Sequence, residues 1–266
     1  MTHASASIGQ FVRTWRKHRG LSQLGLALEA EISQKHLSFI ESGRSSPSRD
    51  MVLQLAERLD VPLRDRNAML LAAGFAPVFR DRPLTDPSLA RAMTTIERLL
   101  KAHEPYPALT VDRRWNMVGA NTAVLPLLAG VAPELMKPPV NVLRASLHPR
   151  GLAPVIVNLA EWSAHVLERL RRQIRITGDR MLDPLLRELT AYSPASAHPA
   201  GGRPPSPTDD IAVPLKLRSH GGVLSFLSTV TVFGTAVDIT LSELSLEAFY
   251  PADPETAAAL GDRGAP

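Results

Sequence analysis

The sequence contains no cysteine among its 266 residues. Disulfide frameworks, cysteine-based zinc fingers and cysteine nucleophiles are therefore excluded, and a reducing compartment such as the cytoplasm fits. The chain also lacks the motifs G-x-S-x-G, G-x-x-x-x-G-K-[ST], G-x-G-x-x-G and H-E-x-x-H, which serve hydrolases, phosphate-binding enzymes, dehydrogenases and metalloproteases. We therefore expect a protein that is not an enzyme and holds no cofactor or metal.

Little in the chain suggests membrane insertion. The segment from Met1 to Gln10 lacks the apolar core of a signal peptide. Two uncharged stretches of 19 residues, Trp115–Pro133 and Ser219–Val237, approach the length of a membrane span. The first contains asparagine and proline, and the second is rich in serine, threonine and glycine. We expect neither stretch to cross a membrane, and we expect a soluble cytoplasmic protein.

The positive charge of the chain is concentrated in its first third. Residues 1–82 hold 12 Lys or Arg and 8 Asp or Glu, whereas residues 83–266 hold 18 of each kind. Hydrophobic residues make up 44% of the chain, which is enough to build real cores. If the partner is a polyanion, we expect its contacts in the N-terminal third.

The first 74 residues have the pattern of closely spaced short helices. Serine stands at four positions where a helix can begin, namely Ser7, Ser22, Ser33 and Ser48, and serine is a strong N-cap. The predicted helices cover about 8–19, 23–30, 34–41, 49–59 and 64–73. The spacing of Leu24, Ala27, Ile32, Leu37 and Ile40 is suited to packing the second helix steeply on the third.

The third of these helices exposes polar side chains that are able to bond base edges or phosphates, and a helix fits the major groove of DNA. The segment from Leu21 to Arg44 resembles the helix-turn-helix of the XRE/Cro-repressor family, and the likeness extends over about residues 8–63. The matching positions include Ser22-Gln23, Leu37-Ser38-x-Ile40-Glu41-x-Gly43-Arg44 and Pro47.

This resemblance implies roles for individual residues. Gln23 and Arg44 should hold phosphates, and His36 should contact a base or a phosphate. The remaining contacts should come from the start and the outer face of the third helix, namely Ser33, Gln34, Lys35 and Ser38. The resemblance also implies that Arg16 forms a structural ion pair with Glu41 behind this helix, although a phosphate contact of Arg16 is an alternative.

One residue departs from the family pattern. The turn usually has glycine where this chain has Glu31. A left-handed backbone at this position would cost a glutamate about 1 kcal/mol.

The pattern of apolar and polar residues changes after the first domain. Residues 75–104 should form a linker and an amphipathic helix from Leu89 to His103, which either connects the two domains or pairs with a copy of itself. We then expect strands near 109–118, a helix capped by Asn121, a long helix from Pro154 to Thr177 and another over 181–192. Beyond a loop at 193–208, the pattern predicts a hairpin over 211–232, with Pro214 at a sheet edge, and a strand from Val237 onwards.

Two groups of residues in this half resemble known domains. The pattern Asp112-x-x-Trp115-x-x-Val118-x-x-Asn121 resembles the opening of PAS domains. The segments 147–154, 158–162 and 233–238 resemble the ligand-binding domain of MmyB-type regulators, which combine an XRE domain with a PAS-like effector domain. The resemblance implies an apolar ligand such as a fatty acid.

Four residues are candidates for binding such a ligand: Trp115, Asn158, Glu161 and Trp162. Each has an alternative role, because the tryptophans fit a core and the two polar residues fit a solvated helix face or a dimer interface. Glu161 and His165, four residues apart, give only a feeble metal signal because no further ligand is evident. Arg169, Arg171, Arg172 and Arg175 form a basic run that we expect to remain solvated, with contact to acidic headgroups or DNA as the alternative.

We therefore predict a two-domain protein of the α plus α/β class. An all-α, lambda-repressor-like helix-turn-helix domain spans residues 1–74, a linker spans 75–104, a PAS-like antiparallel sheet with inserted helices spans 105–255, and a tail spans 256–266. The predicted function is sequence-specific transcription regulation by a homodimer that binds double-stranded, palindromic DNA. The C-terminal domain either senses an apolar small molecule or serves as a ligand-free interaction module.

Overall fold

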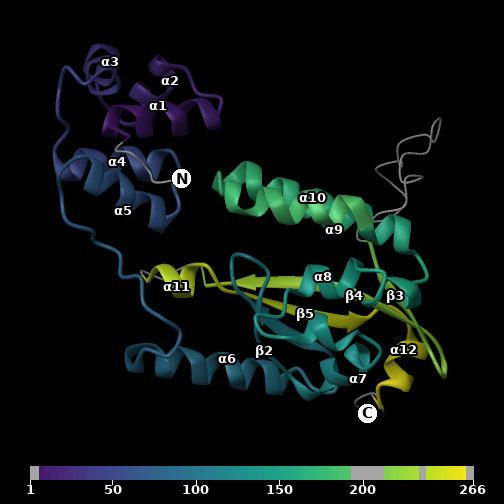
Figure 1. Cartoon of the computed structure of the whole chain (residues 1–266). Coiled ribbons are helices and arrows are strands. Elements are labelled where there is room, and N and C mark those ends of the chain that lie inside the picture. Colours follow the sequence, from purple (N-terminus) through teal and green to yellow (C-terminus); the bar gives the residue numbers. More distant parts are fainter. Residues whose placement is uncertain (1–5, 193–212, 234–237, 262–266) are drawn as a thin grey trace, which may run out of the picture. The chain divides into compact units, whose positions relative to one another are not determined.

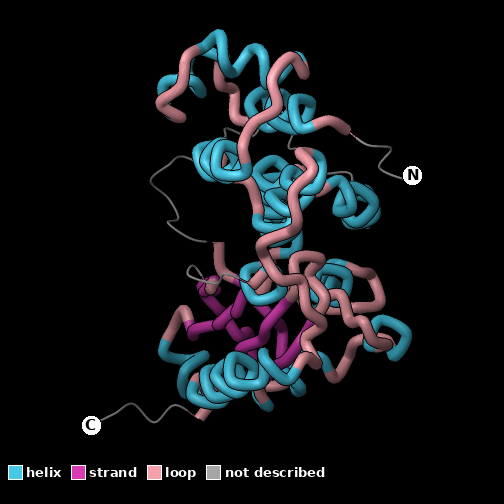
Figure 2. Tube along the Cα trace, turned by 90° about the vertical axis from the view of Figure 1, so that its left-hand side faces the viewer, coloured by secondary structure: helices cyan, strands magenta, loops and turns pink. Residues whose placement is uncertain are grey.

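The computed structural model describes residues 6–192, 213–233 and 238–261 (Figure 1). The described residues form two compact units with separate hydrophobic cores. The first unit consists mainly of the chain up to Pro83, and the second unit begins at Leu84. In Figure 2 the strands of the described chain are confined to the second unit.

The first unit is built from short helices that begin where the sequence predicts them. Ser7, Ser22, Ser33 and Ser48 each accept a hydrogen bond from a backbone N–H of the following helix, so all four act as N-caps. The helices are α1 (Ile8–His18), α2 (Gln23–Glu29), α3 (Gln34–Ser42), α4 (Arg49–Arg58) and α5 (Leu63–Ala72).

Helices α1 and α3 approach each other closely because α1 carries Gly9. A Cβ atom added at Gly9 would lie 2.4 Å from the carbonyl oxygen of Ile40. Ala27, Leu37 and Ile40 are buried in the core of this unit, as their spacing predicts. Leu24 was expected in this core but is 52% exposed. Leu26 is fully buried in α2 beside Ala27, so the buried face of this short helix includes Leu26 in place of Leu24.

The second unit contains a five-stranded antiparallel sheet. Its strands are β1 (Ala108–Val111), β2 (Met117–Ala120), β3 (Leu215–Ser219), β4 (Gly222–Val232) and β5 (Ser245–Pro251). They lie in the order β2-β1-β5-β4-β3, and every neighbouring pair is antiparallel. Strand β3 is an edge strand, as predicted, but it begins directly after Pro214, whereas the predicted hairpin included this proline.

Helices are inserted between the early and the late strands, which confirms the predicted PAS-like fold class. These inserted helices are α7 (Leu125–Leu128), α8 (Val142–Leu147), α9 (Leu159–Thr177) and α10 (Asp183–Tyr192). Helix α6 (Ala90–Ala102) precedes β1, and α12 (Pro254–Ala259) follows β5. In Figure 1, α6 lies along one face of the sheet and α8 lies along the other. A further short helix, α11 (Ile239–Ser242), belongs to the first unit.

Three local predictions were wrong. Helix α9 begins at Leu159 rather than at Pro154, because Ile156 and Val157 leave the helical path to pair with β3. Asn121 does not cap the following turn; its side chain instead bonds backbone atoms of Leu100, Tyr106 and Ala108. The further strand expected from Val237 onwards is present as β5 but begins only at Ser245; residues Ile239–Ser242 form α11 instead, and Val237 lies outside the described residues.

The unit boundaries also differ from the expected domain boundaries. The first unit continues to Pro83 instead of ending at residue 74, and α6 packs within the second unit instead of standing between domains. The expected tail includes most of α12, where Thr256 is fully buried. The loop predicted at 193–208 lies outside the described residues.

None of the described helices has the length and apolar character needed to cross a bilayer.

Candidate nucleic-acid interface and ligand cavity

Helices α2 and α3 form the helix-turn-helix that the sequence predicts. The hydroxyl oxygen of Ser33 accepts a hydrogen bond of 3.1 Å from the backbone N–H of His36, which fixes the first turn of α3. Gly43 ends α3 in the left-handed conformation with a φ of 75°. Since a residue with a Cβ adopts this conformation only with strain, glycine is the natural residue at this helix end.

The outer face of α3 carries the polar side chains that the sequence singled out. Gln34 and Lys35 are exposed, whereas His36 and Ser38 are half-buried. Ser33 has its hydroxyl oxygen engaged in the helix cap. The face thus offers amide, ammonium, imidazole and hydroxyl groups over the first turns of one helix, which is a set suited to reading base edges.

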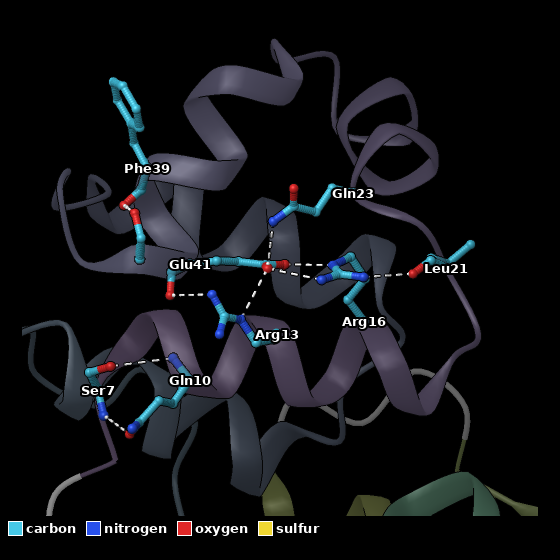
Figure 3. A network of polar contacts seen from close by, with 9 residues as sticks. Ser7, Gln10, Arg13, Arg16, Leu21, Gln23, Phe39 and Glu41 are labelled. Atoms are coloured by element: carbon cyan, nitrogen blue, oxygen red, sulfur yellow. Dashed lines mark hydrogen bonds and ion pairs between the residues drawn. The ribbon is translucent and has the colours of Figure 1, made fainter.

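Phe39 is a half-buried residue of this helix that sequence analysis missed. The Lys35 ammonium lies 5.7 Å from the centre of its ring, and the Arg44 guanidinium lies 5.8 Å from it. In Figure 3 the ring points away from the polar network behind the helix. An aromatic residue among polar ones has no clear signal in a single sequence, because its spacing from Leu37 and Ile40 is also compatible with a core position.

Behind α3, a buried carboxylate holds three helices together (Figure 3). The Arg16 guanidinium donates from Nε to Glu41 Oε1 at 2.5 Å and from Nη2 to Glu41 Oε2 at 2.9 Å. Gln23 adds a bond of 2.9 Å from Nε2 to Oε2, and Arg13 adds a longer one of 3.4 Å. The structure thus contains the Arg16–Glu41 pair that the family resemblance implies.

The electrostatics of this network favour the ionised form of Glu41. Burial by itself would raise the pKa of this carboxyl, since its side chain is completely inaccessible to solvent. The hydrogen bonds of Arg16, Gln23 and Arg13, together with the charge of Arg16, outweigh burial and lower the pKa. In turn, the bond to Glu41 raises the pKa of Arg16. The pair is therefore fully charged at neutral pH.

The two expected phosphate contacts lie in different surroundings. Gln23 is half-buried and its amide nitrogen donates to Glu41, so only part of its hydrogen-bonding capacity is left for a phosphate. Arg44 is exposed just after Gly43, and its backbone N–H donates to the carbonyl of Phe39 at 2.8 Å. The phosphate roles of both residues stay predictions.

The turn between α2 and α3 is strained at Glu31. Its φ is 53°, in the left-handed region that the sequence led us to consider for this residue. An L-residue with a Cβ is disfavoured there because the Cβ atom crowds the following carbonyl oxygen. The chain therefore keeps the turn geometry with a residue that fits it poorly.

We expect Glu31→Gly to stabilise the first unit by about 1 kcal/mol, because glycine adopts this backbone without strain. Hydrogen exchange of peptides covering α2 and α3 in the full chain measures the gain. The control is Glu29→Gly, which places glycine at the last position of α2 and should not stabilise the unit. A loss of protection in the Glu31→Gly variant would contradict the strain argument.

The second unit encloses a cavity of about 90 Å³ between the sheet and helices α7, α8 and α9. Trp115 and Trp162, two of the four predicted ligand contacts, line it. Most of the other lining side chains are apolar, among them Leu109, Val166 and Phe226. An enclosed apolar cavity with few polar groups is the usual form of a small-molecule site.

Two charged groups meet at the wall formed by Trp115. The Glu247 carboxylate on β5 forms an ion pair with Arg169 on α9, and the distance from Arg169 Nη2 to Glu247 Oε1 is 2.5 Å. The Arg169 guanidinium lies 4.6 Å from the centre of the Trp115 ring. Burial raises the pKa of Glu247, and the charge and hydrogen bond of Arg169 oppose this rise. Arg169 was expected to be solvated, so its place beside the cavity is a correction.

Trp115 is held in place by its backbone turn and by its indole nitrogen. Its φ of 67° is unusual for a bulky residue. Asp112 supports the turn by accepting bonds from the backbone N–H groups of Arg114 and Asn116. The indole Nε1 donates to Gln173 at 2.7 Å. Strain of this kind is found at functional sites more often than elsewhere.

The other two predicted ligand contacts do not line the cavity. Asn158 donates to Glu161 at 2.9 Å and to the backbone carbonyl of Pro214 at 2.8 Å, and it accepts from the backbone N–H of Lys216. These bonds tie the start of α9 to β3. Asn158 therefore has a structural role in the described fold, with Glu161 as its partner.

His165 lies beside the cavity wall but shows no sign of a metal site. Its ring stacks on Trp162 with centroids 5.6 Å apart, and burial lowers its pKa. Among the described residues, no group of three potential ligands that includes Glu161 and His165 comes together.

Two family models match the chain. Residues 92–262 match the MmyB-like transcription regulator ligand binding domain, and residues 12–65 match a helix-turn-helix model. No curated protein matches the sequence significantly. Among solved structures, that of an RNA-binding light-oxygen-voltage receptor aligns over 97% of this chain with 14% identity and a TM-score of 0.25. The chain spans 63% of the length of that receptor chain.

Proposed function

The chain belongs to the family of MmyB-like transcription regulators, and from its helix-turn-helix unit we infer that it regulates transcription by reading a specific DNA sequence with α3. The observation that carries this proposal is the pairing of two features of α3. Its outer face exposes Gln34 and Lys35, and its inner face is fixed by the buried Glu41 network. A helix that is held rigidly from behind presents its side chains to base edges in one register.

The contacts divide into two kinds. Gln34, Lys35 and Ser38 are proposed to face bases, and His36 a base or a phosphate. Phe39 is a further candidate, because an aromatic edge suits the methyl group of thymine. Ser33, Gln23 and Arg44 are proposed to lie near phosphates, which fix the register of the protein on the duplex without reading sequence.

Arg44→Ala should weaken binding to every duplex by a similar factor, because a phosphate contact carries no sequence information. The dependence of the binding constant on salt should also become shallower by about one phosphate contact. Fluorescence anisotropy with a selected and a scrambled duplex, across a salt series, measures both effects. A loss confined to the selected duplex would place Arg44 at a base instead.

We propose that the protein acts as a homodimer in the cytoplasm. A single helix-turn-helix unit buries little DNA surface, and two copies on half-sites about 34 Å apart provide specific affinity. Sedimentation of the full chain with and without operator DNA tests this. A monomer in both conditions would contradict the proposed dimer.

The cavity of the second unit is proposed to bind an apolar, fatty-acid-like molecule. The support is the enclosed, mostly apolar lining that includes Trp115 and Trp162. The ligand would regulate the protein by binding one dimer geometry more tightly than another, since equal affinity for both shifts no population. The alternative is a ligand-free interaction module, and native mass spectrometry for a co-purified lipid distinguishes the two.

Filling the cavity should abolish ligand binding. We expect 1-octanol to raise the unfolding temperature of the wild-type chain, because a ligand that binds only the folded state stabilises it. Val166→Trp, which places an indole in the cavity, should remove this rise. The matched control is Val232→Trp at an exposed position of β4, outside the cavity lining. An undiminished rise in the Val166→Trp variant would contradict binding in this cavity.

A further inference from the structure

The wall of the cavity contains a buried carboxylate, that of Glu247. The Glu247 side chain is only 9% exposed, yet the residue lines the cavity together with Arg169 and Trp115. Glu247 stands in β5, where its register partners are Leu109 on β1 and Val230 on β4. A carboxylate between two apolar strand residues, facing a cavity, is costly unless it has a partner. The partner in this structure is Arg169.

This ion pair disfavours a ligand that carries its own carboxylate. An ionised carboxylate at this wall would stand close to that of Glu247, and like charges repel strongly where water is excluded. The Arg169 guanidinium is already ion-paired with Glu247. Two carboxylates would therefore have to share one cation, with a net negative charge left in the cavity.

A hydroxyl group has no such conflict. It is able to donate its proton to the Glu247 carboxylate while its oxygen accepts an N–H from the Arg169 guanidinium. The charge of the wall stays balanced, and each polar group keeps a hydrogen-bond partner. The alkyl part of the ligand would then lie against apolar residues of the cavity lining, such as Leu128, Leu143 and Leu152.

We propose that the cavity selects an alkyl molecule that ends in a hydroxyl group over the ionised carboxylate of the same chain length. This inference rests on the proposed binding of an apolar ligand. It narrows the fatty-acid-like class to molecules with an alkyl chain and an uncharged, donating head.

The experiment compares 1-octanol with octanoate on the full chain near neutral pH, with the fluorescence of the cavity tryptophans or calorimetry as the readout. We expect 1-octanol to bind at least about tenfold more tightly, which corresponds to about 1.4 kcal/mol. Glu247→Gln should raise the affinity for octanoate by at least about tenfold, because the charge of Arg169 is then unbalanced. The affinity for 1-octanol should change less.

The control variant is Glu243→Gln, which makes the same chemical change outside the cavity, where Glu243 pairs with Arg113 at 3.5 Å. This variant should keep the preference of the wild type. Equal or tighter binding of octanoate by the wild type would overturn the inference, as would an unchanged preference in Glu247→Gln. If the Glu247→Gln variant does not fold, the relative affinities of the wild-type chain for 1-octanol and octanoate alone decide the inference. Failure of both probes to bind would overturn the proposed apolar ligand itself.

Discussion

Replacing Glu41 by glutamine should destabilise the first unit by about 3–5 kcal/mol, because the change leaves the buried Arg16 guanidinium without a counter-charge. The side chain of Arg16 is 10% exposed and that of Glu41 is inaccessible. Neither group regains water when the other is neutralised. The new amide of glutamine would also place a donor against the donors of Arg16 or Gln23.

Hydrogen exchange of the α1 and α3 amides in the full chain measures this loss. Exchange at these amides reports the free energy of opening of the first unit separately from that of the second. Glu57→Gln, an exposed residue of α4, is the matched control and should stay within about 0.5 kcal/mol. Joint replacement of Arg16 by methionine and Glu41 by leucine should be less harmful than Glu41→Gln alone, since no charge is left buried. Unchanged protection in Glu41→Gln would contradict the desolvated network.

The same network predicts how the first unit responds to acid. The folded state lowers the pKa of Glu41 below its ordinary value of 4.5. Its contribution to stability is therefore present above this value and is lost as the pH falls through the lowered pKa. In the Glu41→Gln variant, the stability that hydrogen exchange of the α1 and α3 amides reports should no longer fall with pH in this range.

The double substitution Gln34→Ala and Lys35→Ala should weaken binding to the operator by at least about thirtyfold. Each base contact contributes about 1–3 kcal/mol, and the two side chains are exposed neighbours at the start of α3. Their separate losses need not add, because adjacent contacts are coupled. The fold should be unaffected, since neither side chain is buried.

Anisotropy titrations with the selected operator and a scrambled duplex measure this loss. The control is Arg58→Ala, which removes one positive charge from the exposed end of α4 and should reduce binding only slightly. Base contacts predict that the double variant loses its preference for the operator. A uniform loss on both duplexes would assign the two residues to phosphates, and no loss would remove α3 from the interface.

The helices of the first unit follow from the sequence because their signals are local. Each N-cap serine acts within its own helix turn, and Gly43 ends α3 by its own backbone freedom. The sequence shows that Glu31 departs from the family pattern at the turn. Only the structure shows that the φ of this residue is positive. Leu24 was misplaced because a seven-residue helix has too few positions to define its buried face.

The second unit was less predictable because its decisive contacts join distant residues. The break before α9 results from pairing of Ile156 with Leu217, which no local pattern around Pro154 reveals. Asn121 looked like a cap because asparagine before a short turn usually is one, and its three long-range bonds override that role.

The candidate sites show the same division. Gln34 and Lys35 were found on α3 because exposure follows from helical spacing. The cavity wall was not found, because Arg169 and Glu247 meet only through the packing of α9 on β5. A run of four arginines, taken by itself, indicates exposure to solvent. The buried carboxylate that pairs with Arg169 belongs to Glu247, which lies in a different element, β5.

Selection of bound sequences from a random duplex pool by the full chain tests whether α3 reads a specific DNA sequence. If α3 reads the sequence in a dimer, a symmetric motif with two half-sites about one helical turn apart is enriched, and this enrichment is lost when Gln34 and Lys35 are both alanine. Failure of the wild-type chain to retain any duplex at low salt, or equal enrichment by the double variant, would contradict sequence reading by α3.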